Sequence, residues 1–152
     1  MLIEFFVEGT PKAQPRPRAF ARRFANGKVM ARVYDPGTAE GWKSEIALAA
    51  RKHIPKAPII GPIKLTLVFT FARPTSHFGT GKNASNLKPS APEWHTSKPD
   101  LDNLNKSTQD CLTALQMWRD DSQVVEASAK KRWVCMASLA GAKITIEYGE
   151  SR

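Results

Sequence analysis

The sequence has little of three features that define whole classes of protein. No apolar run in its 152 residues approaches the roughly 20 needed to span a bilayer, and the start MLIEFFVEGTPK lacks the basic and apolar regions of a secretory signal. Its two cysteines, Cys111 and Cys135, form no CxxC motif and no framework typical of a secreted scaffold. Its three histidines, His53, His77 and His95, lie too far apart for zinc-ligand spacing. We therefore expect a cytoplasmic protein with reduced cysteines and no membrane partner, in which any metal is bound by oxygen.

Acidic residues are also scarce. Asp and Glu number 14 against 23 Lys and Arg, which gives a formal net charge of +9 and an isoelectric point of about 9.8. This balance favours a polyanionic partner, above all nucleic acid, although small basic proteins are common and charge alone says nothing of catalysis. With 41% hydrophobic residues, the chain is long enough for one compact domain with a core and short for two. We expect a single domain over residues 1–152.

The hydrophobic pattern predicts both strands and helices. Residues 63–71 (IKLTLVFTF) alternate apolar with other side chains, as a half-buried strand does. Residues 38–53 and 100–117 repeat apolar side chains every three or four positions, which is typical of amphipathic helices, and Thr38 is a suitable N-cap. Further strands are predicted at 2–7, 124–136 and 143–148, the last two joined by a turn near Gly141. This order predicts an α/β or α+β fold, with a mixed sheet packed against two main helices.

Two long segments between these elements are expected to be loops. Residues 9–34 contain three prolines and seven basic side chains but no acidic one, with Phe20, Phe24 and Tyr34 interspersed. This basic loop fits either a solvated arm or a nucleic-acid surface, and its aromatic residues favour the second because rings stack on exposed bases. Residues 73–99 are rich in Gly, Ser, Asn and Pro, and a loop of that length in a compact domain is usually functional or disordered. We expect it to be functional.

Two carboxylates stand at the predicted start of the second helix, in the run KPDLDNLNK. A helix N-terminus favours the ionised form of both Asp100 and Asp102. Residues two apart in a regular helix point about 200° apart, so Asp100 must lie at or before the N-cap if both are to bind one metal ion. Helix capping alone explains one of the two aspartates but not the second. Lys106, four residues beyond Asp102, is either an ordinary surface ion-pair partner or a cation that stabilises charge near a bound phosphate.

A further acidic pair, Asp120 and Asp121, follows this helix in the run WRDDSQVV. Two adjacent aspartates in a turn usually serve the turn itself. If the strand that begins near Gln123 runs back alongside the helix, one of these carboxylates can join Asp100 and Asp102. Three carboxylates suit Mg²⁺, a hard cation that keeps several water ligands and also binds substrate phosphate. Such a cluster on a basic protein favours a metal site over a plain binding surface.

These motifs resemble those of a known enzyme family. KPDLDNLNK followed by WRDDSQVV resembles the active-site motifs of the RusA family of Holliday junction resolvases, and the run GTPKAQPRPR is more loosely similar to its N-terminal half. The resemblance implies a RusA-like fold. It also implies that Asp100, Asp102 and Asp121 are the catalytic, metal-binding carboxylates, that Mg²⁺ is the cofactor and that Lys106 is a catalytic lysine.

The same resemblance implies a function. The protein would be a homodimer that binds a four-way DNA junction and resolves it by symmetric, Mg²⁺-dependent paired nicks during DNA recombination and repair, near the nucleoid of a bacterial or phage-infected cell. Its DNA-binding residues would be Arg16, Arg18, Arg22, Arg23, Lys98, Lys130, Lys131 and Arg132. Two alternatives remain open: a less selective endonuclease acting on flaps or forks, and a non-catalytic DNA-binding module whose aspartates only cap the helix.

Overall fold

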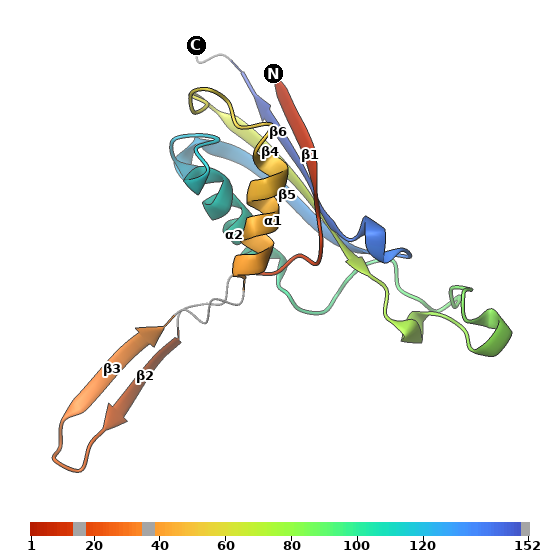
Figure 1. Ribbon diagram of the computed structural model, residues 1–152, viewed down its shortest axis with the longest axis horizontal. Helices are drawn as coiled ribbons and strands as arrows, with labels where there is room; N and C mark the ends of the chain where they lie inside the picture. The colour runs from red at the N-terminus through yellow and green to blue at the C-terminus, as the bar shows by residue number, and fades with distance from the viewer. Residues whose placement is uncertain (14–17, 35–38, 150–152) are drawn as a thin grey trace.

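The protein folds around a mixed sheet of four strands. The computed structural model describes residues 1–13, 18–34 and 39–149, with only the backbone described at 18–20, 22 and 31–34. The strands are β1 (Leu2–Glu8), β4 (Ile63–Ala72), β5 (Val124–Val134) and β6 (Gly141–Tyr148). They lie in the order β1-β6-β4-β5, with β6 antiparallel to β1 and β4, and β5 parallel to β4 (Figure 1).

One face of the sheet is apolar because its central strands alternate. The buried apolar side chains of β4 occupy every second position, at Ile63, Leu65, Leu67, Phe69 and Phe71. Three of them pair with the buried Ala142, Ile144 and Ile146 of β6. Because directly paired residues share a face, the two strands together form one continuous apolar surface.

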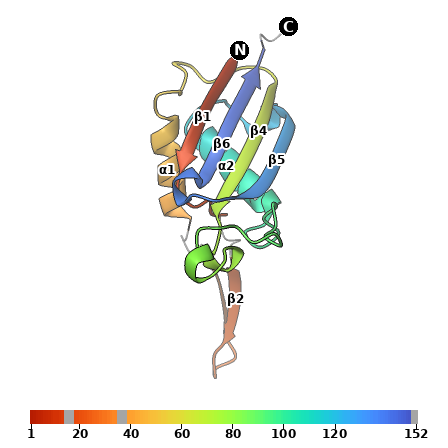
Figure 2. The ribbon, with the colours of Figure 1, turned by 90° about the vertical axis from the view of Figure 1, so that its right-hand side faces the viewer.

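Two helices cover that apolar face. α1 (Glu40–Ala50) buries Trp42, Ile46 and Ala50 against it, and α2 (Leu101–Ala114) buries Leu104 and Leu112. Figure 2 shows both helices on one side of the sheet, with the other side uncovered. The expected α+β fold, a mixed sheet packed with two helices, is confirmed. The expected N-cap Thr38 lies outside the described residues.

The structure corrects the expectation that residues 9–34 form a loop. β2 (Arg18–Arg23) pairs with the antiparallel β3 (Val29–Tyr34), and the turn between them contains Gly27, whose φ of +79° suits glycine. The prolines that suggested a loop all precede Arg18, so they interrupt neither strand. The resulting hairpin extends away from the sheet and its helices (Figure 1).

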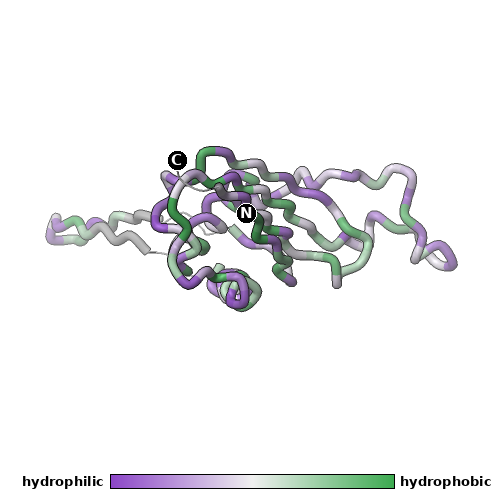
Figure 3. The backbone as a smooth tube through the Cα atoms, turned by 90° about the horizontal axis from the view of Figure 1, so that it is seen from above, coloured by the Kyte–Doolittle hydropathy of each residue, from purple (hydrophilic) through white to green (hydrophobic). Residues whose placement is uncertain are grey.

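The long segment after β4 leaves the sheet and then returns to it. It contains short 3-10 turns at Thr75–His77 and Gly81–Asn83, and its outer part is mainly hydrophilic (Figure 3). On its return, the carbonyl of Glu93 accepts a hydrogen bond from the backbone N–H of Trp133 at 3.1 Å. The segment thereby covers the outer edge of β5 near the end of that strand.

The connection from β4 to β5 determines where the ends of α2 lie. The two strands are parallel, so the chain must cross back between them, and α2 is part of that crossing. The N-terminus of α2 therefore lies at the end of β4, and its C-terminus lies where β5 begins. β5 and β6 are joined through a 3-10 turn at Ala137–Leu139, but they are not adjacent, because β4 lies between them.

Candidate active site

Two carboxylates stand at the N-terminus of α2. Asp100 has an extended backbone (φ −68°, ψ 140°) and directly precedes the helix, while Asp102 lies in the first turn. The prediction that Asp100 lies outside the regular helix is confirmed. Its side chain makes no capping hydrogen bond, so capping does not explain its presence. Both residues are exposed at the helix end that attracts negative charge.

Lys106 lies one turn beyond Asp102 and is paired with Asp110. Its Nζ is 3.2 Å from Oδ1 of Asp110, and its side chain is 76% exposed. The ion pair therefore forms with the next carboxylate along the helix and not with Asp102. Exposed pairs at this spacing are worth only about 0.3–0.5 kcal/mol. A phosphate bound near Asp102 can therefore compete for this ammonium group.

Asp121 lies at the opposite end of α2. Its carboxylate accepts hydrogen bonds from the hydroxyl of Thr113 and, at 3.5 Å, from Nε1 of Trp118. Thr113 stands eleven residues after Asp102, which is about 16 Å along an α-helix. Among the residues that the structure describes, no three acidic, histidine or cysteine side chains form a metal-binding group.

The expectation that the following strand returns Asp121 to the acidic pair within one chain is therefore wrong. β5 does run back toward the start of α2, but it begins at Val124, three residues after Asp121. It is the later residues of β5, and not Asp121, that lie near the acidic pair. The chemical role expected for Asp121 stays a prediction.

Asp120 serves the turn before β5. Its carboxylate accepts a hydrogen bond from the N–H of Ser122 at 2.8 Å, and hydrogen bonds from Ser122 lower the pKa of Asp120. Gln123 completes a capping box: its Oε1 accepts from the N–H groups of Arg119 and Asp120, at 2.8 and 3.1 Å. This role of Gln123 was not predicted, although its position three residues after Asp120 indicates it. These contacts leave Asp121 as the member of the pair that the turn does not require.

The three consecutive basic residues of β5 point to two different faces. Lys131 is paired with the buried Phe69 of β4, so it lies on the face that the helices cover. Lys130 and Arg132 alternate with it and lie on the uncovered face. The Nζ of Lys131 donates hydrogen bonds to two backbone carbonyls just before α2. Lys131 is thus separated from the two neighbours that were expected to bind DNA together with it.

The other basic residues expected to bind DNA lie elsewhere. Arg23 is exposed on the hairpin, and Lys98 is exposed just before the acidic pair. Arg16 lies outside the described residues, as do the side chains of Arg18 and Arg22. A hollow of about 450 Å³ beside Asp100 is lined by Thr10, Pro11, Lys12, Ala13, Phe71, Lys98 and Pro99. Its two lysines make it suitable for a phosphate near the acidic pair.

Aromatic rings pack where the long segment returns to the sheet. His95 is buried between Phe71 and Trp133, with its ring centroid 4.2 Å from each of theirs. Burial lowers the pKa of His95, and the nearby positive charge of Lys131 lowers it further. The sequence alone gives no indication of this packing role for His95. The structure places it between a residue of β4 and a residue of β5.

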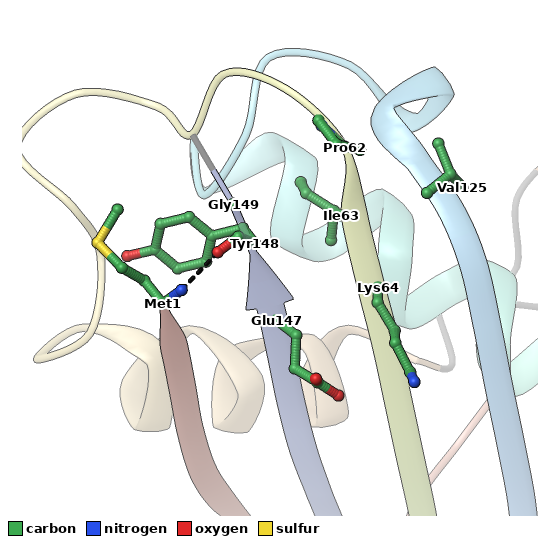
Figure 4. A pocket seen from close by; sticks show the side chains of 8 residues that line it. All are labelled: Met1, Pro62, Ile63, Lys64, Val125, Glu147, Tyr148 and Gly149. Carbon is green, nitrogen blue, oxygen red and sulfur yellow. Dashed lines mark hydrogen bonds between the residues drawn. The ribbon is translucent and has the colours of Figure 1, made fainter. Parts of the chain in front are cut away.

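A second hollow, of about 380 Å³, lies at the other end of the sheet, where β4 begins (Figure 4). It is lined by Met1, Pro62, Ile63, Lys64, Val125, Glu147, Tyr148 and Gly149. The N-terminal amine donates a hydrogen bond to the carbonyl of Tyr148 there, at 2.6 Å. None of the predicted site residues lines this hollow. The candidate active site therefore remains at the start of α2.

Residues 8–147, nearly the whole chain, match the family model described as endodeoxyribonuclease RusA. The chain belongs to the RusA family. The "Uncharacterized protein YqaN" of Bacillus subtilis (strain 168) is 37% identical to it over 134 residues, 85% of this chain and 86% of that protein. The crossover junction endodeoxyribonuclease rusA of Lactococcus phage r1t is 56% identical over 39 residues, 26% of this chain and 30% of that protein.

Membership of the RusA family makes the chain a nuclease that hydrolyses DNA. The alternative of a non-catalytic DNA-binding module is therefore wrong. The resemblance expected from KPDLDNLNK and WRDDSQVV is confirmed at the level of the family. In the described part of this RusA chain, no helix has both the length and the apolar character needed to cross a bilayer.

Proposed function

We propose that this RusA family member resolves Holliday junctions by Mg²⁺-dependent, symmetric paired nicks, acting as a homodimer in DNA recombination and repair in the cytoplasm of a bacterial or phage-infected cell. The observation that most supports this is the pair of exposed carboxylates, Asp100 and Asp102, at a helix start in a protein of net charge +9. Two carboxylates repel a DNA phosphate unless a cation lies between them. A metal-dependent nuclease accounts for both the basic surface and its acidic centre.

The donor set of this site fits Mg²⁺. Asp100 and Asp102 offer exposed carboxylate oxygens, and Asp100 does not use its own to cap the helix. Mg²⁺ is commonly bound through one or two carboxylates together with water and substrate phosphate. When bound, it would polarise the scissile phosphate and make the attacking water more acidic.

The protein's own groups would hold the phosphate next to this pair. The backbone N–H groups at the start of α2 point toward the same place and favour an anion there. Lys106 would leave its weak pair with Asp110 and stabilise the negative charge that develops on the phosphate. Lys12 and Lys98, which line the adjacent hollow, would bind the neighbouring part of the DNA backbone.

A second subunit would complete the site. β5 is an edge strand, and no described strand pairs with its outer side between Glu126 and Lys131. If two β5 strands paired antiparallel about a two-fold axis, the start of each would lie beside the end of the other. Asp121, just before β5, would then approach Asp100 and Asp102 of the partner subunit. Because Asp121 lies far from Asp100 and Asp102 within one chain, a site that needs all three carboxylates requires a second subunit.

Cleavage of matched substrates tests this function. A four-way junction, a linear duplex and a flap of the same sequence are incubated with the protein in Mg²⁺ or in EDTA. We expect symmetric cuts in the junction, far slower cleavage of the other two substrates, and no cleavage in EDTA. Equal rates on all three substrates would instead favour the less selective flap or fork endonuclease.

A further inference from the structure

Lys131 holds the segment that leads into the acidic pair. Its Nζ donates hydrogen bonds to the carbonyls of Ser97, at 2.6 Å, and Pro99, at 2.7 Å. These carbonyls belong to two of the three residues that precede Asp100. On the other side of Asp100, its own carbonyl accepts the first hydrogen bond of α2, from the N–H of Leu104 at 3.1 Å. Asp100 is therefore fixed by β5 before it and by the helix after it.

The ammonium group of Lys131 is better placed to hold the backbone than to contact a DNA phosphate. Hydrogen bonds from a charged donor are roughly twice as strong as neutral ones. An ammonium group has three N–H donors, and two of them are used on the two carbonyls. Lys131 is also half-buried, whereas Lys130 on the opposite face is exposed. Of the two lysines, Lys130 has the position expected of a phosphate contact.

We propose that Lys131 is a positioning residue that sets Asp100 at the distance from Asp102 that metal binding requires. This inference rests on the proposed function, since it concerns the same acidic pair. Without the two hydrogen bonds, the backbone before Asp100 would be free to move, and its carboxylate would no longer be held in place. Groups that orient metal ligands in this way typically change metal affinity or activity by about 10- to 100-fold when they are removed.

The test compares matched substitutions on neighbouring positions of one strand. Lys131→Met and Lys130→Met remove the same charge and keep a similar side-chain length. Mn²⁺ binding to the full chain is measured by calorimetry, because Mn²⁺ takes the same oxygen ligands as Mg²⁺. We expect Lys131→Met to weaken Mn²⁺ binding about 10- to 100-fold and to lower kcat for junction cleavage more than it raises KM. Lys130→Met should bind Mn²⁺ as the wild type does and should mainly raise KM.

A second substitution keeps the test decisive if Lys131→Met does not fold. Lys131→Arg retains the positive charge, but the planar guanidinium cannot take the position of a compact ammonium between two carbonyls. We expect Lys131→Arg to retain the salt dependence of junction binding and to bind Mn²⁺ more weakly than the wild type.

The outcomes separate this inference from the proposed function. Wild-type Mn²⁺ affinity in the Lys131 variants would overturn the positioning role, provided that the wild type binds Mn²⁺ and cleaves the junction. If the wild type itself neither binds Mn²⁺ nor cleaves the junction, the proposed function fails, and the inference fails with it.

Discussion

The positions of some residues at the site can be predicted from the sequence, whereas those of others cannot. The position of Asp100 outside the helix followed from helix geometry, because two residues two positions apart cannot otherwise converge. Lys131 lies on the opposite face of β5 from Lys130 and Arg132, as the alternation of side chains along any strand dictates. A run of three like charges nevertheless suggests a single basic surface. The contact of Asp121 with Thr113 depends on tertiary structure, and no local pattern indicated it.

His95 gives a pH-dependent prediction at the residue scale. Its pKa is lowered mainly by burial and also by the charge of Lys131, so folding favours the neutral ring. An unfolded histidine has a pKa of about 6.5. The stability that the neutral ring contributes is therefore fully present above this value and is lost as the pH falls below it, toward the lower pKa of the folded state.

Replacing His95 by Phe should remove this part of the pH dependence, because the new ring is neutral at every pH. In urea denaturation at pH 7.5 and pH 5.5, the wild type should lose more free energy of unfolding between the two conditions than His95→Phe does. An equal loss in both proteins would show that His95 does not contribute.

At the scale of whole elements, strong periodicity was the reliable signal. β4 and α2 lie close to where the apolar pattern placed them, because one face of each is buried. The β2–β3 hairpin differs from the loop expected there, because the prolines that predict a loop all precede its first strand. Asn26-Gly27, a strong hairpin-turn signal, lies between its strands. The placement of β4 between β5 and β6 depends on long-range pairing that no local pattern shows.

The hairpin gives a prediction about salt dependence. Arg23 and Lys28 are exposed on it, and Arg23→Gln combined with Lys28→Gln should reduce the steepness with which junction affinity falls with salt. The slope of log affinity against log salt changes by about 0.9 for each DNA phosphate that the protein no longer neutralises. The melting temperature should stay the same, since β2 and β3 pair with each other and not with the main sheet.

Lys52→Gln combined with Lys56→Gln is the matched control, since both lysines are exposed beyond the far end of α1. This pair removes the same charge and should leave the salt slope nearly unchanged. If both double variants change the slope equally, net charge rather than the hairpin accounts for the effect.

For the whole molecule, the arrangement of the carboxylates predicts how two defective subunits combine. Asp102→Asn and Asp121→Asn subunits should each be inactive alone. If each site combines Asp102 of one chain with Asp121 of the other, a mixed dimer has one site with both substitutions and one site with neither. Mixed dimers isolated by two different tags should therefore nick a cruciform plasmid once, giving nicked circles rather than linear DNA.

Sites built within single chains would give the opposite result, because every site of the mixed dimer would carry one substitution. The mixed dimer would then be as inactive as its parents. Its failure to nick the plasmid would contradict the shared site but leave the metal role of Asp102 open.

Substitution of Asp102 tests most directly whether the acidic pair at the start of α2 is the metal-dependent catalytic centre. Wild type, Asp102→Asn and the exposed control Glu45→Gln are compared on one synthetic four-way junction, for binding and for nicking with and without Mg²⁺. We expect Mg²⁺-dependent nicking by the wild type and the control. Asp102→Asn should not nick, yet it should bind the junction as tightly or more tightly, because a repelling charge is gone. Nicking by Asp102→Asn at the wild-type rate would show that the catalytic centre lies elsewhere.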